Sequence, residues 1–291
     1  MRRLVTVDMV ANKRINETAF IRRKCIDNMQ LCVEEEASKV EEGRGVHGLG
    51  GYEFGRRVGV FKEMKGLMEW NGNANVVDFF PWLRWLDPQG LKRKMKRELG
   101  KAIQIASKFF KERIQERDVG GEKTMDFLDV LLEFEGDGID KPAKISDHDL
   151  IIFILEIFRA GLETTSSTTE WALTELLCNP ATLIEAKAEL TQVIGPSRKI
   201  EEGDIDNLPY LQGIINQTLR LHPSIPFLVP RKAMHDTSLH PKTHRMLHLT
   251  FGMLLHRFDW SLDANVTRET MDWKDKLGIT MTKSEPLLAV P

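Results

Sequence analysis

Two neighbouring residues in the middle of the chain have side chains suited to moving a proton. Glu163 and Thr164 follow the small pair Ala160 and Gly161 in the segment R-A-G-L-E-T-T. A carboxylate and a hydroxyl at a weakened helical turn could supply a proton relay. Gly161 costs roughly 1 kcal/mol inside a helix, and an offsetting gain would be that a flat ligand can lie against the backbone. The alternative is a small-residue helix-packing patch with solvated threonines.

A second polar set follows in the segments Q-T-L-R-L-H-P, residues 217–223, and P-R, residues 230–231. Gln217 and Arg220 are three residues apart, so their side chains are neighbours on one helix face. Taken alone, Arg220 and Arg231 fit surface charges near a helix that ends at a proline.

The elements that position these residues are predicted to be helices. Ser146 and Asp149 resemble a capping box with Asp in place of Glu, so a long helix over about 147–178 should carry the proton-relay candidates. Asn179 followed by Pro180 predicts a capped start for the next helix, and Gly195 predicts its end. Further helices are expected over about 91–117, 126–135, 209–221 and 242–258.

The remaining segments predict loops and short strands. Residues 43–72 are rich in glycine and have no clean period, which indicates a loop or a place where structured sequence has been lost. The proline-containing stretch 225–232 suits an edge strand, and short β pieces are expected within 278–290. The predicted fold is therefore mainly α with small β elements, in a single domain over 1–291.

Composition excludes several classes of protein. The 291 residues include 43 acidic and 41 basic side chains, so the basic surplus typical of a nucleic-acid binder is missing. No apolar run reaches the roughly 18 residues of a transmembrane helix, which predicts a soluble or peripherally attached chain. Three cysteines form neither an even framework nor a C-x-x-C pair, as in a protein with free thiols.

Five motifs in a fixed order resemble one known family. A-G-x-E-T-T, L-C-N-P, D-x-L-P-Y-L-Q, T-L-R-L-H-P and P-F-L-V-P-R occur in this order, and F-D-W-x-L follows near Phe258. This order is similar to that of the cytochrome P-450 family of haem-thiolate monooxygenases, in particular the plant microsomal group that includes terpenol hydroxylases. The resemblance covers most of the chain and is strongest over 146–237. It implies a partial cytochrome P-450 fold.

The resemblance assigns roles to the proton-relay candidates. The long helix would cross the haem, Ala160 and Gly161 would flank the oxygen groove, and Glu163 and Thr164 would deliver protons to bound dioxygen.

The resemblance also assigns roles to four other residues. Arg231 and Arg2 would meet haem propionates, and Gln217 and Arg220 match the family's structural E-x-x-R pair. Because Gln217 replaces a glutamate, a buried Arg220 would be under-compensated, although the amide can still accept a hydrogen bond.

The implied activity is the insertion of one oxygen atom from dioxygen into a small lipophilic substrate, terpenoids among them. Haem would be the cofactor and an NADPH-dependent flavoprotein reductase the electron donor. Family members of this type work at the cytosolic face of the endoplasmic reticulum membrane, whereas a chain without their anchor could be cytoplasmic. The aromatic stretch 79–85 resembles the access loop that meets membrane or substrate, or else forms a buried plug.

One departure from the family is serious. The iron ligand is a cysteine in a loop F-x-x-G-x-R-x-C-x-G, and no such segment occurs among the 291 residues. The loop is expected to have been deleted at a junction over 237–243, and a second excision is expected over 43–66. The chain is therefore predicted to be a catalytically disabled monooxygenase, with no metal ligand of its own. The alternative is a non-catalytic helical remnant that acts as a binding or scaffold protein.

Three weaker motifs suggest other classes. His240, His244 and His248 recur at four-residue spacing, as zinc ligands on a helix can, but also as ordinary surface histidines do. The G-x-G-x-x-G at 43–48 follows an acidic helix instead of a strand, unlike a dinucleotide-binding turn. The basic run 92–97 could contact anionic lipid or an acidic partner, or form a solvated helix face.

Overall fold

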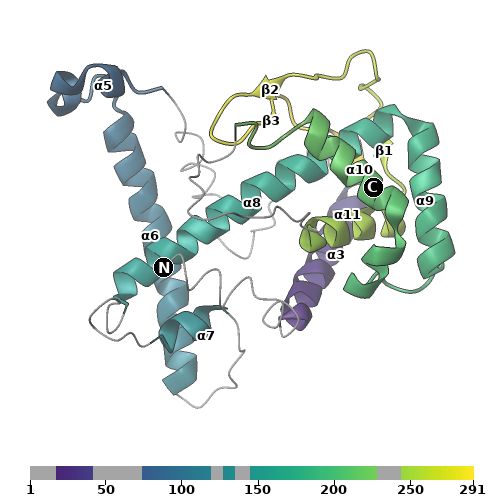
Figure 1. Ribbon diagram of the computed structural model, residues 1–291, viewed down its shortest axis with the longest axis horizontal. Coiled ribbons are helices and arrows are strands. Elements are labelled where there is room, and N and C mark those ends of the chain that lie inside the picture. The colour runs from purple at the N-terminus through teal and green to yellow at the C-terminus, as the bar shows by residue number, and fades with distance from the viewer. Residues whose placement is uncertain (1–17, 42–73, 119–126, 135–144, 228–243) are drawn as a thin grey trace, which may run out of the picture. The chain divides into compact units, whose positions relative to one another are not determined.

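The computed structural model describes residues 18–41, 74–118, 127–134, 145–227 and 244–291 (Figure 1). These residues are mostly helical, with four strands of two residues each, which confirms the mainly α fold. The chain divides into two compact units, 1–22 with 53–161 and 23–52 with 162–291. The predicted junctions at 43–66 and 237–243 lie outside the described residues, as do Arg2, Arg231 and His240, and the single domain stays a prediction.

Unit 1 is built from helices. They are α5 (Val76–Phe79), the 3-10 helix η3 (Pro81–Trp85), α6 (Leu91–Asp118), α7 (Phe127–Leu132) and the first part of α8 (Asp147–Cys178). Its core joins Ala102 and Phe110 of α6 to Leu131 of α7 and Leu155 of α8. Most of the basic run 92–97 is exposed on α6, which fits a solvated helix face and also leaves the run accessible to anionic lipid or an acidic partner.

The start of α8 shows one half of the predicted capping box, because the Ser146 backbone N–H makes no bond to the Asp149 carboxylate among the described residues. The Asp149 backbone N–H donates to Ser146 Oγ at 3.1 Å, and the Ser146 hydroxyl donates to Asp149 Oδ2 at 2.7 Å. A side-chain cap of this kind satisfies an N–H that has no partner within the helix.

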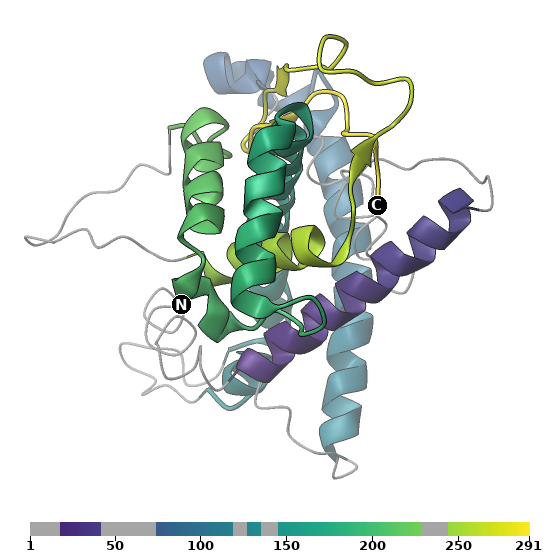
Figure 2. The ribbon, with the colours of Figure 1, turned by 90° about the vertical axis from the view of Figure 1, so that its right-hand side faces the viewer.

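Unit 2 contains most of α3 (Ala19–Glu41), the rest of α8, α9 (Pro180–Ile194), the 3-10 helix η4 (Glu202–Asn207), α10 (Pro209–Leu221) and α11 (Arg245–Arg257). In Figure 2, α11 lies across α9 and α10. Every residue from Leu247 to Leu255 is buried, because a helix that is apolar on nearly all sides belongs in the centre of a unit.

The ends of α9 and α10 follow local signals. Pro180 opens α9, and Gly195, with φ of 83°, ends it in a backbone region that favours glycine. Pro223 follows the last turn of α10, as predicted. The expected cap by the Asn179 side chain is wrong, because this amide donates to the Glu175 carbonyl of the preceding helix at 2.8 Å instead.

Short strands complete unit 2. β1 (Ser261–Leu262) pairs antiparallel with β4 (Ala289–Val290), and β2 (Asp275–Lys276) pairs antiparallel with β3 (Thr282–Lys283). The strand expected over 225–232 is wrong for its described part, since residues 225–227 form bends and a turn. No described strand pairs with residues 225–227. The carbonyl of the neighbouring Ser224 accepts one hydrogen bond, from the Met281 N–H at 2.8 Å.

Within the described ranges, no helix is long and apolar enough to cross a lipid bilayer.

Candidate functional site

The proton-relay candidates lie on one continuous helix, α8. Ala160 and Gly161 are exposed, and Glu163 and Thr164 are half-buried. A Cβ atom built on Gly161 would meet nothing within 4 Å, so the helix is open at this turn. The Glu163 carboxylate has no hydrogen-bond partner among the residues that the structure describes. Among the described residues, nothing packs against the Gly161 position of α8.

The turn that carries Thr164 is fixed by two hydroxyls that the sequence did not single out. The Thr168 hydroxyl donates to the Thr164 carbonyl at 2.9 Å, and Thr168 Oγ1 lies 3.0 Å from Ser224 Oγ. Ser224 Oγ also lies 3.3 Å from the Thr164 carbonyl. Because Thr168 and Ser224 are buried, this network ties the α8 turn to the segment after α10.

A second hydroxyl ties α8 to the C-terminal segment. The Ser167 hydroxyl donates to the Met281 carbonyl at 2.9 Å, and the Met281 N–H donates to the Ser224 carbonyl. The only sequence signal was the run S-S-T-T at 166–169. Its three buried residues could have been found from their place on the core side of an amphipathic helix.

The predicted pair of Gln217 and Arg220 is confirmed. Arg220 Nε donates to Gln217 Oε1 at 2.9 Å. Both side chains are exposed, so water solvates the guanidinium of Arg220. The expectation of a buried, under-compensated Arg220 is therefore wrong.

Two buried charged residues lie beside Trp171. Lys283 Nζ is 5.4 Å from the centroid of the Trp171 ring, and the Glu170 carboxylate accepts the Leu287 N–H at 2.9 Å. Burial lowers the pKa of Lys283 and raises the pKa of Glu170, since loss of water disfavours both charged forms. These groups stabilise the tail against α8.

Cys178 does not fit an iron ligand opposite the Glu163 turn. Cys178 lies fifteen residues beyond Glu163 at the far end of α8, which corresponds to about 22 Å along a helix. It is 3% exposed, and burial raises the pKa of its thiol, whereas a metal-binding thiolate needs a lowered pKa. Cys25 and Cys32 lie on α3.

The histidine pattern does not form a shared site in the described part of the chain. His244 is the exposed residue before α11, and His248 is buried, with Nδ1 2.8 Å from the His244 carbonyl. Among the described residues, no group of three or more potential ligand side chains could hold a metal ion.

Comparison with known proteins places the chain in a family. The model of the family described as cytochrome P450 (here written P-450) matches residues 48–241. The chain is 37% identical to cytochrome P-450 76A2 of Solanum melongena, over the whole chain and 74% of the relative. It is 33% identical to an iridoid oxidase of Catharanthus roseus, again over the whole chain and 73% of the relative.

Two further similarities agree with this placement. A geraniol 8-hydroxylase of Catharanthus roseus is 33% identical over 79% of the chain and 59% of its own length. A zebrafish cytochrome P-450 solved with progesterone superposes with a TM-score of 0.61 at 18% identity, covering 92% of this chain and 81% of the other. At this identity, the structural similarity shows the fold only. The chain therefore belongs to the cytochrome P-450 family, is similar to plant terpenol hydroxylases, and has haem as the cofactor that its family implies.

Proposed function

We propose that this chain is a member of the plant terpenoid-hydroxylating monooxygenases that does not itself catalyse the oxygenation. Its relatives' chemistry would use haem, dioxygen and electrons from an NADPH-dependent flavoprotein reductase at the cytosolic face of the endoplasmic reticulum, on a small lipophilic substrate. In such enzymes a cysteine thiolate on iron favours O–O cleavage. Glu163 and Thr164 can pass protons usefully only if iron is held opposite them.

This proposal is supported by the place of Cys178, the cysteine that shares a helix with Glu163. Cys178 is buried at the other end of the same helix, and its thiol pKa is raised. The family's ligand loop has no counterpart in the sequence. The roles that the family assigns to Ala160 and Gly161 would then have no metal to serve, and the roles of Arg2 and Arg231, which lie outside the described residues, stay a prediction.

The alignment lengths support an internal loss. The chain has 291 residues, but its alignment with cytochrome P-450 76A2 runs over 372 positions while using all of this chain. At least 81 positions of the alignment therefore face gaps in this chain. A loss of this size is large enough to include the ligand loop.

The test is a reduced carbon monoxide difference spectrum of the purified chain after expression with added haem precursor. We expect no thiolate-type Soret band. The iridoid oxidase, expressed and assayed in the same way, is the control for haem supply. A thiolate-type band from this chain, at a stoichiometry close to one haem per chain, would overturn the proposal.

A second function, peripheral membrane attachment, is favoured by the surface of unit 1. Phe79, Trp82 and Trp85 are 74%, 68% and 81% exposed, in the short helices that precede the basic start of α6. Aromatic rings beside lysines and arginines are typical of segments that lie in a membrane interface. Asp87 accepts the N–H groups of Lys92 and Arg93 at 3.1 Å each, which joins the aromatic segment to the start of α6.

Vesicle co-sedimentation tests this attachment. The chain should bind phosphatidylcholine vesicles that contain phosphatidylserine, and the double variant Trp82→Ser, Trp85→Ser should bind at least fivefold less. The exposed Trp273→Ser in unit 2 is the matched control and should bind as the parent does. Equal binding by all three chains would contradict a membrane role for residues 79–85.

A further inference from the structure

A cavity in unit 2 has none of the residues of the Glu163 turn in its lining and carries a cluster of cations. It has a volume of about 370 Å³, within the range of small-molecule sites. Its walls come from α3, from the turn between α9 and η4, and from the end of α11. Four lining residues carry a permanent positive charge, and a single lining carboxylate, Asp27, opposes them; the cations are Arg23, Arg198, Lys199 and Arg257.

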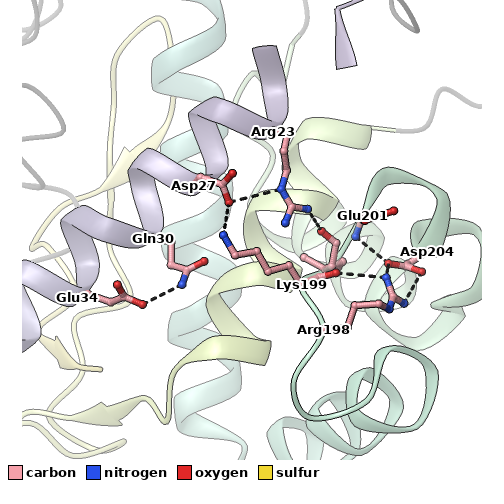
Figure 3. Close-up of polar contacts among 9 residues, drawn as sticks. Arg23, Asp27, Gln30, Glu34, Arg198, Lys199, Glu201 and Asp204 are labelled. Atoms are coloured by element: carbon pink, nitrogen blue, oxygen red, sulfur yellow. Dashed lines mark hydrogen bonds and ion pairs between the residues drawn. The ribbon is translucent and has the colours of Figure 1, made fainter. Parts of the chain in front are cut away.

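Part of this charge is used to hold the walls together (Figure 3). Lys199 Nζ donates to Asp27 Oδ1 at 2.7 Å, and Arg23 Nη1 donates to the Ile200 carbonyl at 2.6 Å. Arg198 forms a bidentate pair with Asp204 of η4, with both N···O distances 2.8 Å. These bonds fix three cationic side chains around the cavity, so their positions are set before any ligand arrives.

Donor capacity remains on the cations after these bonds are counted. Arg257 contacts Glu34 only through Nε, at 3.4 Å, so neither of its Nη groups has a partner among the described residues. The Lys199 ammonium has three N–H groups and makes one bond to a described side chain. Ser197 is also a lining residue, and its hydroxyl makes no hydrogen bond within the described ranges.

The cavity also has an apolar part. Ile26, Ile200 and Met253 lie in its lining, next to the cationic groups. Ile26 and Ile200 are each 2% exposed and belong to the core of the unit. A donor-rich wall beside an apolar floor suits a ligand with an anionic head and a small organic body.

We propose that this cavity binds a small organic phosphate, with Arg257, Lys199 and Ser197 as donors to the phosphate oxygens. Arginine and lysine are the side chains that bind phosphate oxygens most strongly, because their hydrogen bonds are charge-assisted. Asp27 limits the affinity for an anion in two ways. Its carboxylate repels the phosphate, and it competes with the phosphate for the Lys199 ammonium. Hydrogen bonds from Lys199 and the nearby Arg23 keep the pKa of Asp27 low, so it is charged at neutral pH.

Isothermal titration calorimetry with inorganic pyrophosphate tests the site on the full chain. Arg257→Gln and Lys199→Gln should each weaken binding about tenfold, as expected for a lost charge-assisted bond. Asp27→Asn should tighten binding severalfold. Arg245→Gln removes an exposed charge from the other end of α11 and should leave the affinity unchanged. Arg257→Gln should fold, because its ion pair with Glu34 is exposed.

A second ligand identifies the source of the phosphate. Dihexanoyl phosphatidic acid, below its micelle concentration, presents the same phosphate on a lipid. Tighter binding of this lipid than of pyrophosphate, with the same pattern across the variants, would assign the site to a lipid headgroup, and the reverse order to a soluble phosphate. Either result supports the site.

Three outcomes would overturn the proposal. The first is the absence of binding by both ligands. The second is an equal loss of affinity in Arg245→Gln and Arg257→Gln. The third is that the variants lower the melting temperature while the affinity stays constant, which would mean that the cations serve only to hold α3 in place.

Discussion

The Trp171 and His222 rings lie face to face, with centroids 3.9 Å apart and planes 3° from parallel. Trp171 is buried in the last part of α8, and His222 is the residue that ends α10. His222 Nε2 lies 2.9 Å from Glu175 Oε1, one turn further along α8. The stack therefore joins the helix that carries Glu163 to the segment that holds Ser224 beside Thr164.

Trp171→Ala should strongly destabilise unit 2. Removal of a fully buried aromatic side chain costs about 3–5 kcal/mol, and here the stacking partner would lose its contact as well. Urea unfolding followed by circular dichroism measures the change. Trp273→Ala is the control: that ring is 6.3 Å from Trp171 and 40% exposed, so its loss should cost clearly less. Equal losses would show that the stack contributes little.

The stability of the chain should fall as the solution is acidified below about pH 6.5. Burial lowers the pKa of His248, and its Nε2 has no hydrogen-bond partner among the described residues. As the pH falls through the ordinary histidine pKa, the unfolded chain binds a proton that the folded chain does not, so the free energy of unfolding decreases. The decrease ends once the pH passes below the lowered pKa of the folded state.

Two histidine variants isolate this effect. His248→Leu should remove that part of the pH dependence between pH 5 and 7, as measured by urea unfolding at several pH values. His244→Gln replaces an exposed ring next to the same helix and should keep most of the slope. A slope that survives in His248→Leu would assign the acid sensitivity to other groups.

Two helical glycines should respond in opposite ways to alanine. A Cβ on Gly252 of α11 would lie 2.6 Å from Ile200 Cδ1 and 3.1 Å from Leu211 Cδ2, so Gly252→Ala should cost about 1–3 kcal/mol through overpacking. A Cβ on Gly213 of α10 would meet nothing within 4 Å, so Gly213→Ala should add up to about 1 kcal/mol of helix propensity. Thermal unfolding compares the two, and stabilisation by Gly252→Ala would contradict the packing of α11.

The capping box of α8 should contribute measurably to stability. Ser146→Ala removes the acceptor of the Asp149 N–H and should cost about 1 kcal/mol. Ser146→Asp restores a capping oxygen and should recover most of that loss. Ser166→Ala changes an exposed serine inside the same helix and should have a smaller effect. Hydrogen exchange of the amides at the start of α8 locates the change.

Local signals explain why several elements could be predicted from the sequence. The long helix over 147–178, with Ser146 and Asp149 at its start, and the proline at the first position of α9 are features of neighbouring residues. A helix over 147–178 also fixes that Glu163 and Thr164 share one turn, because helix geometry is regular. The pairing of Gln217 with Arg220 was predictable for the same reason.

Predictions that depend on distant partners were less successful. The strand expected at 225–232 fails in its described part, because a strand needs a neighbour that sequence periodicity does not supply. The motif around Arg220 could not show that this side chain is exposed. Ser224 and Thr168 are 56 residues apart, so neither local segment could predict the contact between their hydroxyls.

The sequence by itself determined the family and the helices, and it shows that no cysteine stands in the family's ligand loop, because these are properties of residue order. The tertiary structure decided that Ser224 meets Thr168 beside the Thr164 turn, and that Arg257 and Lys199 line one cavity with α3. These depend on contacts between segments far apart in the chain, which form only when the apolar faces of the helices are buried together.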